Sequence, residues 1–427
     1  MSRFTQRGAG ALYTAGIHAY QGLVRLASSR NAKARDMLAG RKDTLSRLRQ
    51  ALAPHERPVW VHAASLGEFE QGRPLMEKLR REQPGRKIVL SFYSPSGFRV
   101  RKDWEGADAV VYLPADTPGA MRSFLDALRP CMAIFVKYEF WGNCLLELQR
   151  RGVPTYLISA VFRPDQVFFA RHGGWFLSLL HCFRRIYVQD EGSRHLLASH
   201  GVGHVTVAGD TRFDRVTDIM RSTRDIPALD RFSRGGTRLI FMAGSSWEAD
   251  EDVYFPWLKA HAGKLLTVIA PHEFDPERLE SIRRRLAPEL KTVLYSEAQD
   301  NPSLLDSADC LVMDCFGLLS SAYRYANVAY IGGGFGDGIH NINEAAVYGI
   351  PVVFGPRHSK FIESRELIEA GGGFCASGAK EFASLMDRRL MAQAARAEAG
   401  RAAGDYIASK LGATGLIYDD IFVKESR

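Results

Sequence analysis

Residues 58–68 read Pro-Val-Trp-Val-His-Ala-Ala-Ser-Leu-Gly-Glu, an apolar run that passes directly into the start of a predicted helix. A carboxylate at this point lies where a strand meets a helix, at the edge of an open α/β sheet where ligands usually bind. Gly67 lets the backbone bend and a substrate approach, and Glu68 offers a base for a hydroxyl proton. The alternative is that Glu68 is only a first-turn acid favoured by the helix dipole.

Short apolar runs alternate with helical stretches along the rest of the chain, in two sets. The predicted strands are residues 59–62, 87–92, 109–113, 133–136, 155–158, 186–188 and 205–208 in the first set, and 239–243, 265–270, 292–295, 310–313, 328–331 and 352–354 in the second. Apolar strands separated by helices indicate parallel sheets covered on both faces. Because 427 residues exceed what one core usually holds, the expected fold class is α/β with two doubly wound, Rossmann-like domains.

The charged and polar segment 216–236 is the predicted linker between these domains. It separates an N-terminal domain over residues 51–215 from a C-terminal domain over 237–405, and we expect ligands to bind in the cleft between them. The Ala-rich end of the chain is predicted to form helices, of which residues 406–427 pack back on the first domain.

Residues 1–50 hold ten Arg and Lys against two Asp, which accounts for the whole net charge of +8. Tyr13, Ile17, Tyr20 and Val24 recur there at helical spacing, but polar residues interrupt the stripe, which therefore lacks the ~20 apolar residues of a membrane span. The pattern predicts an amphipathic, basic helix on an anionic membrane surface. The alternative is a helix packed on the domain with a solvated basic face. We identify no secretory signal and expect a cytoplasmic, membrane-apposed protein.

The six cysteines and twelve histidines show no paired spacing of the zinc or redox type. We therefore expect reduced core cysteines and no protein-bound metal. The basic excess is confined to the N-terminus, and we expect no nucleic-acid partner.

A glycine-rich stretch, Gly332-Gly-Gly-Phe-Gly-Asp-Gly-Ile-His-Asn-Ile-Asn-Glu344, follows the predicted strand 328–331 and leads into a predicted helix that ends near Gly349. Glycines at a strand end free backbone N–H groups to hold a phosphate. Asn341 and Glu344 have two interpretations: a cap and its capping-box partner, or, for Glu344, a carboxylate that binds a ribose. The spacing fits neither the dinucleotide fingerprint nor a P-loop.

Eight segments together resemble, in the same order, those of the 3-deoxy-D-manno-octulosonic acid (Kdo) transferases of lipopolysaccharide and lipid A biosynthesis. They are residues 62–68, 92–97, 112–118, 136–143, 209–214, 243–251, 270–278 and 332–355. The resemblance implies a GT-B glycosyltransferase at the cytoplasmic face of the inner membrane. Such an enzyme moves Kdo from CMP-Kdo to a lipid A precursor of the lipid IVA type.

The resemblance also implies roles for single residues. Glu68 would be the general base that deprotonates the acceptor hydroxyl, and Glu139 and Arg212 would lie near the transferring sugar, where a cation meets its carboxylate or the departing phosphate. The positions implied to bind the CMP-sugar donor are Pro271, His272, Gly317, Leu318, Leu319, Gly333, Gly334, Asn341, Ile342, Asn343 and Glu344. Ser245 and Ser246, after the predicted strand 239–243, would add hydroxyl donors.

When a sugar is transferred from a CMP-linked donor, the leaving group is CMP, a phosphate monoester. A monoester needs less charge neutralisation than a diphosphate. No Asp-x-Asp metal motif lies at a predicted strand end. We therefore expect an inverting displacement that uses neither a metal nor a cofactor.

The chain departs from the family pattern at three positions. Lys137 stands in the first acidic place of a segment that usually reads Glu-Thr-Glu-Leu-Trp-Pro-Asn. His272 follows Pro271 where the family has Pro-Arg-His, so one arginine is missing, and Leu318 replaces an acid. Arg357 and Lys360 are either compensating cations or solvated loop charges.

Two other functions remain open from the sequence. One is a GT-B enzyme of other specificity, such as a sialic-acid-type transferase or a sugar-nucleotide epimerase, which CMP release that depends on a lipid A acceptor would exclude. The other is a nucleotide-sugar binding protein without turnover, which would have no activity to lose in Glu68→Gln.

Overall fold

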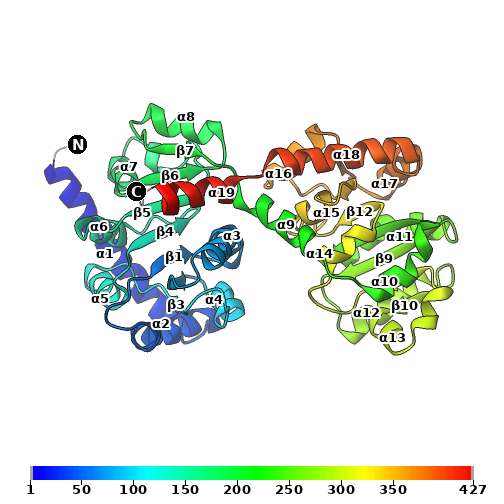
Figure 1. Ribbon diagram of the computed structural model, residues 1–427, viewed down its shortest axis with the longest axis horizontal. Helices are drawn as coiled ribbons and strands as arrows, with labels where there is room; N and C mark the ends of the chain where they lie inside the picture. The colour runs from blue at the N-terminus through cyan, green and yellow to red at the C-terminus, as the bar shows by residue number, and fades with distance from the viewer. Residues whose placement is uncertain (1–2, 425–427) are drawn as a thin grey trace. The chain divides into compact units, whose positions relative to one another are not determined.

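The computed structural model describes residues 3–424, with side chains from residue 8 onward (Figure 1). The chain forms two compact units: unit 1 is Met1–Asp214 with Gly412–Arg427, and unit 2 is Arg215–Leu411. The outermost residues of the predicted segments 1–50 and 406–427, residues 1–2 and 425–427, lie outside the described part.

Unit 1 contains a sheet of seven parallel strands in the order β3-β2-β1-β4-β5-β6-β7. The strands are β1 (Val59–Ala63), β2 (Ile88–Phe92), β3 (Ala109–Tyr112), β4 (Met132–Val136), β5 (Thr155–Ala160), β6 (Arg185–Val188) and β7 (Val205–Val207). Every residue of β1 and β2 is buried, as expected of central strands covered on both faces. From β1 the chain adds β2 and β3 on one side and then returns to place β4 on the other side of β1. The strand order therefore reverses between β1 and β4, the position where doubly wound sheets bind ligands.

Helices cover both faces of this sheet and enclose two apolar clusters. They are α1 (Arg3–Ala27), α2 (Ala32–Ala51), α3 (Leu66–Glu82), α4 (Pro95–Arg101), α5 (Pro118–Leu128), α6 (Gly142–Arg150), α7 (Gly174–Leu179), α8 (Glu191–Ser199), the start of α9 (Thr211–Arg221), and α19 (Ala413–Tyr418). Pro at the first turn of α4 and α5 suits positions whose N–H has no helical partner.

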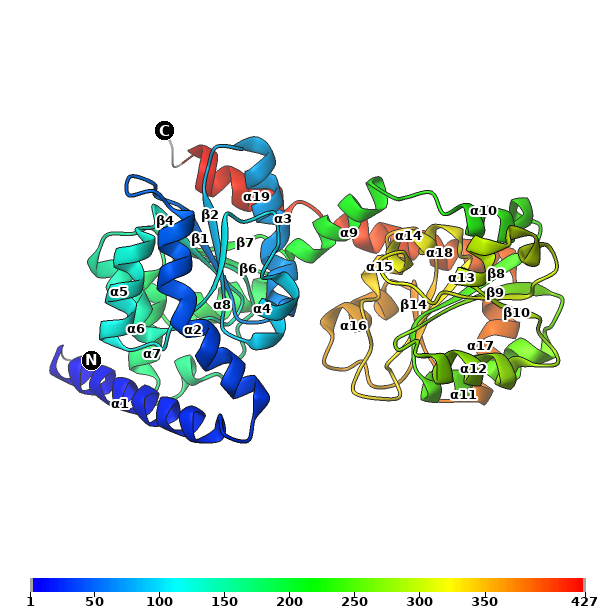
Figure 2. The ribbon, with the colours of Figure 1, turned by 90° about the horizontal axis from the view of Figure 1, so that it is seen from below.

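Helices α1 and α2 lie on the outside of unit 1 (Figure 2). One face of α1 packs on α6 and α7, where the rings of Tyr13 and Trp175 are 4.8 Å apart and the Tyr13 hydroxyl donates to Asp116 at 2.7 Å. The other face leaves Leu12, Leu23 and Leu26 between 65% and 76% exposed. The helix is thus packed on the domain and apolar on its outer side. No helix within the described residues is long and apolar enough to cross a membrane.

The C-terminal helix α19 packs against α3. The Asp214 carboxylate accepts hydrogen bonds from the N–H groups of Gly412 and Thr414, both at 2.7 Å, and Gln83 donates to the Tyr418 hydroxyl at 3.2 Å. Tyr418 belongs to the apolar cluster of unit 1, so the last turns of the chain are part of that unit's core.

Unit 2 repeats the architecture with the strand order β10-β11-β9-β8-β12-β13-β14. Its strands are β8 (Leu239–Ser246), β9 (Leu265–Pro271), β10 (Thr292–Leu294), β11 (Cys310–Val312), β12 (Val328–Ile331), β13 (Val352–Phe354) and β14 (Gly373–Cys375). Its helices are α10 (Pro227–Phe232), α11 (Glu248–Ala260), α12 (Pro276–Leu286), α13 (Tyr295–Asp300), α14 (Leu319–Ala322), α15 (Asn343–Ala346), α16 (Ile362–Glu369), α17 (Ala379–Leu385) and α18 (Gln393–Ser409). The strand order reverses between β8 and β12.

Residues 216–236, the predicted linker, contain the end of α9 and the whole of α10, which buries Leu229 and Phe232 completely. The edge strand β14 was not predicted, because its three residues are preceded by a run of glycines that reads as a turn.

Candidate functional site

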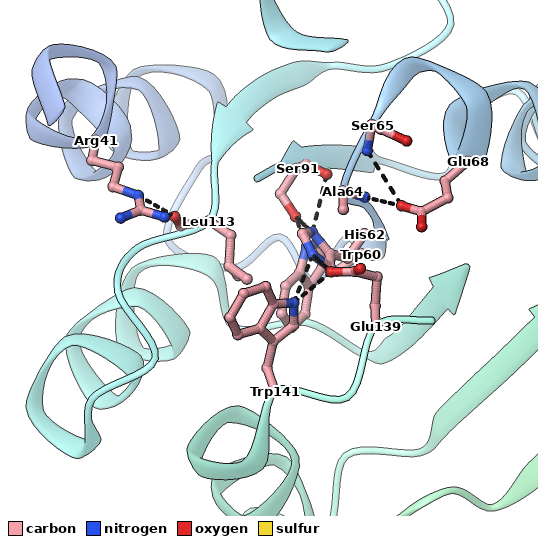
Figure 3. A network of polar contacts seen from close by, with 10 residues as sticks. All are labelled: Arg41, Trp60, His62, Ala64, Ser65, Glu68, Ser91, Leu113, Glu139 and Trp141. Carbon is pink, nitrogen blue, oxygen red and sulfur yellow. Dashed lines mark hydrogen bonds and ion pairs between the residues drawn. The ribbon is translucent and has the colours of Figure 1, made fainter. Parts of the chain in front are cut away.

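The carboxyl end of β1 carries the predicted base. Ser65 is the N-cap of α3, and Glu68 lies in the first turn of that helix. The Oε2 atom of Glu68 accepts hydrogen bonds from the backbone N–H groups of Ala64 (2.6 Å) and Ser65 (3.3 Å), as Figure 3 shows. Glu68 thereby closes the helix start as in a capping box. Within the described residues its other oxygen, Oε1, makes no hydrogen bond.

The surroundings of Glu68 raise the pKa of its carboxyl to about 7. Burial is the largest cause, because it disfavours the charged form, and the negative charge of Glu139 adds to it. The N–H groups of Ala64 and Ser65 and the charge of Lys137 act in the opposite direction. A carboxyl with a pKa near 7 suits general-base catalysis at neutral pH.

Glu139 is fixed beside this base by two side-chain donors. It follows β4, is 7% exposed, and its Oε2 atom lies 2.6 Å from Nε1 of Trp141 and 2.9 Å from Nε2 of His62. His62 belongs to β1 and is fully buried. Figure 3 shows Glu139 and Glu68 on neighbouring segments that leave adjacent strands at the same edge of the sheet.

The His62 ring is oriented from its other side by Ser91, at the end of β2. The Ser91 hydroxyl accepts from Nε1 of Trp60 at 2.8 Å and lies 2.8 Å from Nδ1 of His62. Nδ1 of His62 also lies 3.1 Å from the Ser91 carbonyl oxygen, so Ser91 holds this side of the ring by two atoms. The four side chains form one buried network that ends on Glu139.

The structure brings Glu139 and Lys137 to Glu68, whereas Arg212 pairs with Asp210. Nε and Nη2 of Arg212 donate to Oδ2 of Asp210 at 2.9 and 2.7 Å. Burial alone would raise the pKa of Asp210, but Arg212 brings the pKa below its ordinary value. Lys137 has a left-handed backbone, with φ of 66°, and its charge acts on Glu68. Lys137, which stands where the family has an acid, thus places a cation near Glu68.

In unit 2 the predicted donor residues follow the carboxyl ends of β11, β9, β8 and β12, which are neighbours in the sheet. Ser245 is half-buried with φ of 52°, and Pro271 is the buried last residue of β9. Ser246 differs from the expectation of an available hydroxyl, because it is 1% exposed and its Oγ lies 2.6 Å from the Tyr254 hydroxyl. Gly317 has φ of 83°, and Leu318 and Leu319 begin α14.

Two N–H groups of the glycine-rich loop after β12 contact a carboxylate of the protein. The fully buried Asp250 carboxylate accepts from Gly333 N–H (2.8 Å), Trp247 N–H (3.0 Å) and the Tyr330 hydroxyl (3.0 Å), and the Phe335 N–H also acts on it. Gly334 allows close packing, because a Cβ there would lie 2.6 Å from Gly355 Cα. Asp250 therefore holds part of the loop from inside unit 2.

Asn341 and Glu344 contact each other, with Asn341 Nδ2 donating to Glu344 Oε1 at 3.0 Å. Asn341 Oδ1 accepts from the Asn343 N–H at 3.1 Å, so it closes the start of the four-residue helix α15, which is shorter than predicted. Ile342 is buried. Asn343 is 1% exposed, and its Oδ1 atom has no hydrogen-bond partner among the described residues.

His272 lies over a pair of rings that the sequence did not single out. Its ring centroid is 4.4 Å from that of Trp247 and 4.6 Å from that of His340, with nearly parallel planes. Nε1 of Trp247 donates to Nε2 of His340 at 3.2 Å, so those two rings lie side by side. Burial, and secondarily the His272 charge, lowers the pKa of His340.

Sequence reasoning missed His62, Ser91, Trp141 and Asp250 as parts of the site. His62, Trp141 and Asp250 lie inside segments that carried the family resemblance, which was a usable signal. Ser91 gave none, because its partners are distant in the sequence. Within residues 3–424 no cluster of three or more His, Cys, Asp or Glu could hold a metal.

Solved structures with this architecture include MurG of Acinetobacter baumannii, with a TM-score of 0.56 and 14% identity over 86% of this chain and 99% of that chain. The UDP-GlcNAc 2-epimerase of Neisseria meningitidis bound to UDP-GlcNAc has a TM-score of 0.57 and 12% identity over 85% and 98%. At such identities the likeness establishes the fold, which is that of the GT-B glycosyltransferases.

Residues 39–215 match the family model of 3-deoxy-D-manno-octulosonic-acid transferase (kdotransferase). The transferase of that name from Bordetella pertussis is 28% identical over 385 residues, 86% of this chain and 87% of its own length. The Aquifex aeolicus transferase is 24% identical over 340 residues, 78% and 86%. The family model and these relatives show that the chain is similar to Kdo transferases over most of its length.

Proposed function

We propose that the chain transfers Kdo from CMP-Kdo to a hydroxyl of a lipid A precursor of the lipid IVA type, with inversion at the anomeric carbon, in lipopolysaccharide biosynthesis. The similarity to Kdo transferases supports the sugar, and the donor and acceptor are those that the resemblance implies. The observation that carries the chemistry is Glu68, a carboxyl with a pKa of about 7 and one oxygen without a hydrogen bond at the strand-order reversal.

In the reaction, Oε1 of Glu68 takes the proton of the acceptor hydroxyl while the hydroxyl oxygen forms a bond to the anomeric carbon of Kdo. The bond from that carbon to the phosphate oxygen breaks, and CMP leaves with the electron pair. A single displacement of this kind inverts the configuration. Glu139 strengthens the base by its charge, and we assign the sugar carboxylate to Lys137 and to Arg212, which is paired with Asp210.

Unit 2 supplies the donor site in this proposal. Because the glycine loop is internally bonded to Asp250, the phosphate contacts fall to the hydroxyl of Ser245 and the exposed ring of His272. A phosphate monoester needs little neutralisation, and we propose that neither a metal nor a cofactor takes part.

We further propose that unit 1 lies on the anionic cytoplasmic face of the inner membrane through α1. Its outer side exposes Leu12, Leu23 and Leu26, and Arg25 lies in its last turn. Apolar side chains flanked by cations favour the interface of an anionic bilayer.

The test is incubation of the purified chain with freshly generated CMP-Kdo and a tetra-acylated, bisphosphorylated lipid A precursor in EDTA, followed by mass spectrometry of the lipid. We expect a gain of one or more Kdo units, lost in Glu68→Gln and kept in Glu70→Gln, which removes a partly exposed carboxylate of the same helix. CMP release without acceptor would favour an epimerase or another transferase, and donor binding without any transfer would favour a binding protein.

A further inference from the structure

Phe316 is the most exposed large apolar side chain within the described residues. Its side chain is 85% exposed, although it lies in a well-packed α/β unit. Large aromatic side chains contribute strongly to stability when buried, so an exposed ring beside predicted donor positions is a candidate stacking surface. It follows β11 and immediately precedes Gly317, one of the predicted donor positions.

The turn at Gly317 holds Phe316 outward. Gly317 has φ of 83°, a region that favours glycine. A Cβ at Gly317 would meet nothing within 4 Å, so the glycine serves the turn and not close packing. The conformation that exposes the ring therefore depends on this residue.

Phe274 supports the exposed ring from the neighbouring strand. It follows β9, which pairs with β11 in parallel register, so both phenylalanines leave the sheet at its carboxyl edge. The two centroids are 4.5 Å apart with the planes at 57°. Phe274 is half-buried, and this leaves Phe316 as the ring with an open face.

The surroundings favour a small planar occupant. Acidic side chains flank the two rings along the chain: Glu273 and Asp275 beside Phe274, and Asp314 near Phe316. A long acyl chain needs a wider apolar surface, and an anionic membrane would be repelled by these carboxylates. A nucleobase fits, because it is planar, uncharged and stacks on aromatic rings.

We propose that Phe316, supported by Phe274, is the stacking surface for the pyrimidine base of the donor nucleotide. This inference rests on the proposed CMP-sugar donor and assigns a place to its base. The base lies over the ends of β11 and β9, and the phosphate extends toward His272 and Ser245 at the ends of β9 and β8. Neither phenylalanine was among the donor positions that the family resemblance implied.

The test is titration of the full chain with CMP by calorimetry. We expect Phe316→Ala to weaken CMP binding about tenfold, within the range known for loss of one base–aromatic stack. Phe316→Trp should bind CMP at least as well as the wild type, whereas Phe316→Leu, which is apolar but has no π face, should behave like Phe316→Ala. Ile362→Ala, which truncates a 44% exposed side chain elsewhere in unit 2, is the matched control and should not change binding.

Turnover supplies a second readout. Phe316→Ala should raise KM for CMP-Kdo and leave KM for the acceptor unchanged. If Phe316→Ala binds CMP as tightly as the wild type and still transfers Kdo, the stacking inference is wrong and the proposed donor stands. Absence of CMP binding by the wild-type chain would overturn the donor assignment itself, and the inference with it.

Discussion

Nε2 of His62 lies 2.9 Å from Oε2 of Glu139, and both side chains are buried at the carboxyl edge of the unit 1 sheet. Nε1 of Trp141 donates to the same oxygen at 2.6 Å. The charge of Glu139 is one reason why the pKa of Glu68 stands near 7. The pKa of the proposed base is therefore set in part by a residue that does not itself take the proton.

Replacement of Glu139 by Gln should move the pH dependence of the reaction. Glu68 must be deprotonated to act, so kcat/KM for the acceptor falls as pH drops below about 7. Glu139→Gln removes a negative charge, which lowers the pKa of Glu68 and shifts this acid limb to lower pH. Burial keeps the limb above the ordinary glutamate range. The measurement is a pH–rate profile, with Glu147→Gln on α6 as the control, and an unmoved limb would contradict the coupling.

Replacement of Glu68 by Gln should stabilise unit 1 at high pH while it abolishes transfer. The pKa of Glu68 in the fold, about 7, lies above the ordinary glutamate value of 4.5, so the folded chain binds the proton more tightly than the unfolded chain. Stability contributed by this group is lost as pH rises through that interval. Glutamine does not ionise and retains an oxygen for the Ala64 and Ser65 N–H groups. Thermal unfolding at pH 5 and pH 8 should show a higher Tm for the variant only at pH 8.

Replacement of Asp250 by Asn should loosen the glycine-rich loop. The carboxylate accepts hydrogen bonds from Gly333, Trp247 and Tyr330, and an amide presents N–H groups to some of these donors. A buried donor left without an acceptor costs about 1–3 kcal/mol. Hydrogen exchange should rise in residues 333–338, and the free energy of unfolding of the chain should fall.

The matched control for the loop is Asp252→Asn, two residues along α11. Asp252 is 68% exposed and pairs with Arg285, so its loss should change stability by roughly 1 kcal/mol or less. Equal exchange of the loop in both variants would refute the role of Asp250.

Replacement of Leu23 and Leu26 by Glu should weaken binding to anionic vesicles. Both side chains lie on the outer side of α1, where burial in a bilayer interface stabilises association. Binding of the wild type should fall with salt, because part of the attraction is electrostatic. Sedimentation with phosphatidylglycerol vesicles measures the binding. The control is Leu416→Glu, which changes a 40% exposed side chain on α19. Undiminished binding of the double variant would exclude α1 as the contact.

The sheets were predictable because buried parallel strands are apolar along their whole length, and every strand of the described residues except β14 overlaps a predicted range. Glu68 was predictable for a related reason, since it lies where an apolar run turns into a helix. The partners of His62 were not: Ser91 and Glu139 are 29 and 77 positions away, and only the sheet order brings them together. The same holds for Gly333, whose N–H is taken by a residue 83 positions earlier.

Because Ala64 and Ser65 hold one oxygen of Glu68 against the start of α3, the carboxylate is fixed in direction as well as in position. A sugar acceptor carries several hydroxyl groups of similar acidity, and only a hydroxyl that arrives along the axis of Oε1 meets the base. In the reaction that we propose, the helix cap thus selects among the acceptor's hydroxyls by their angle of approach.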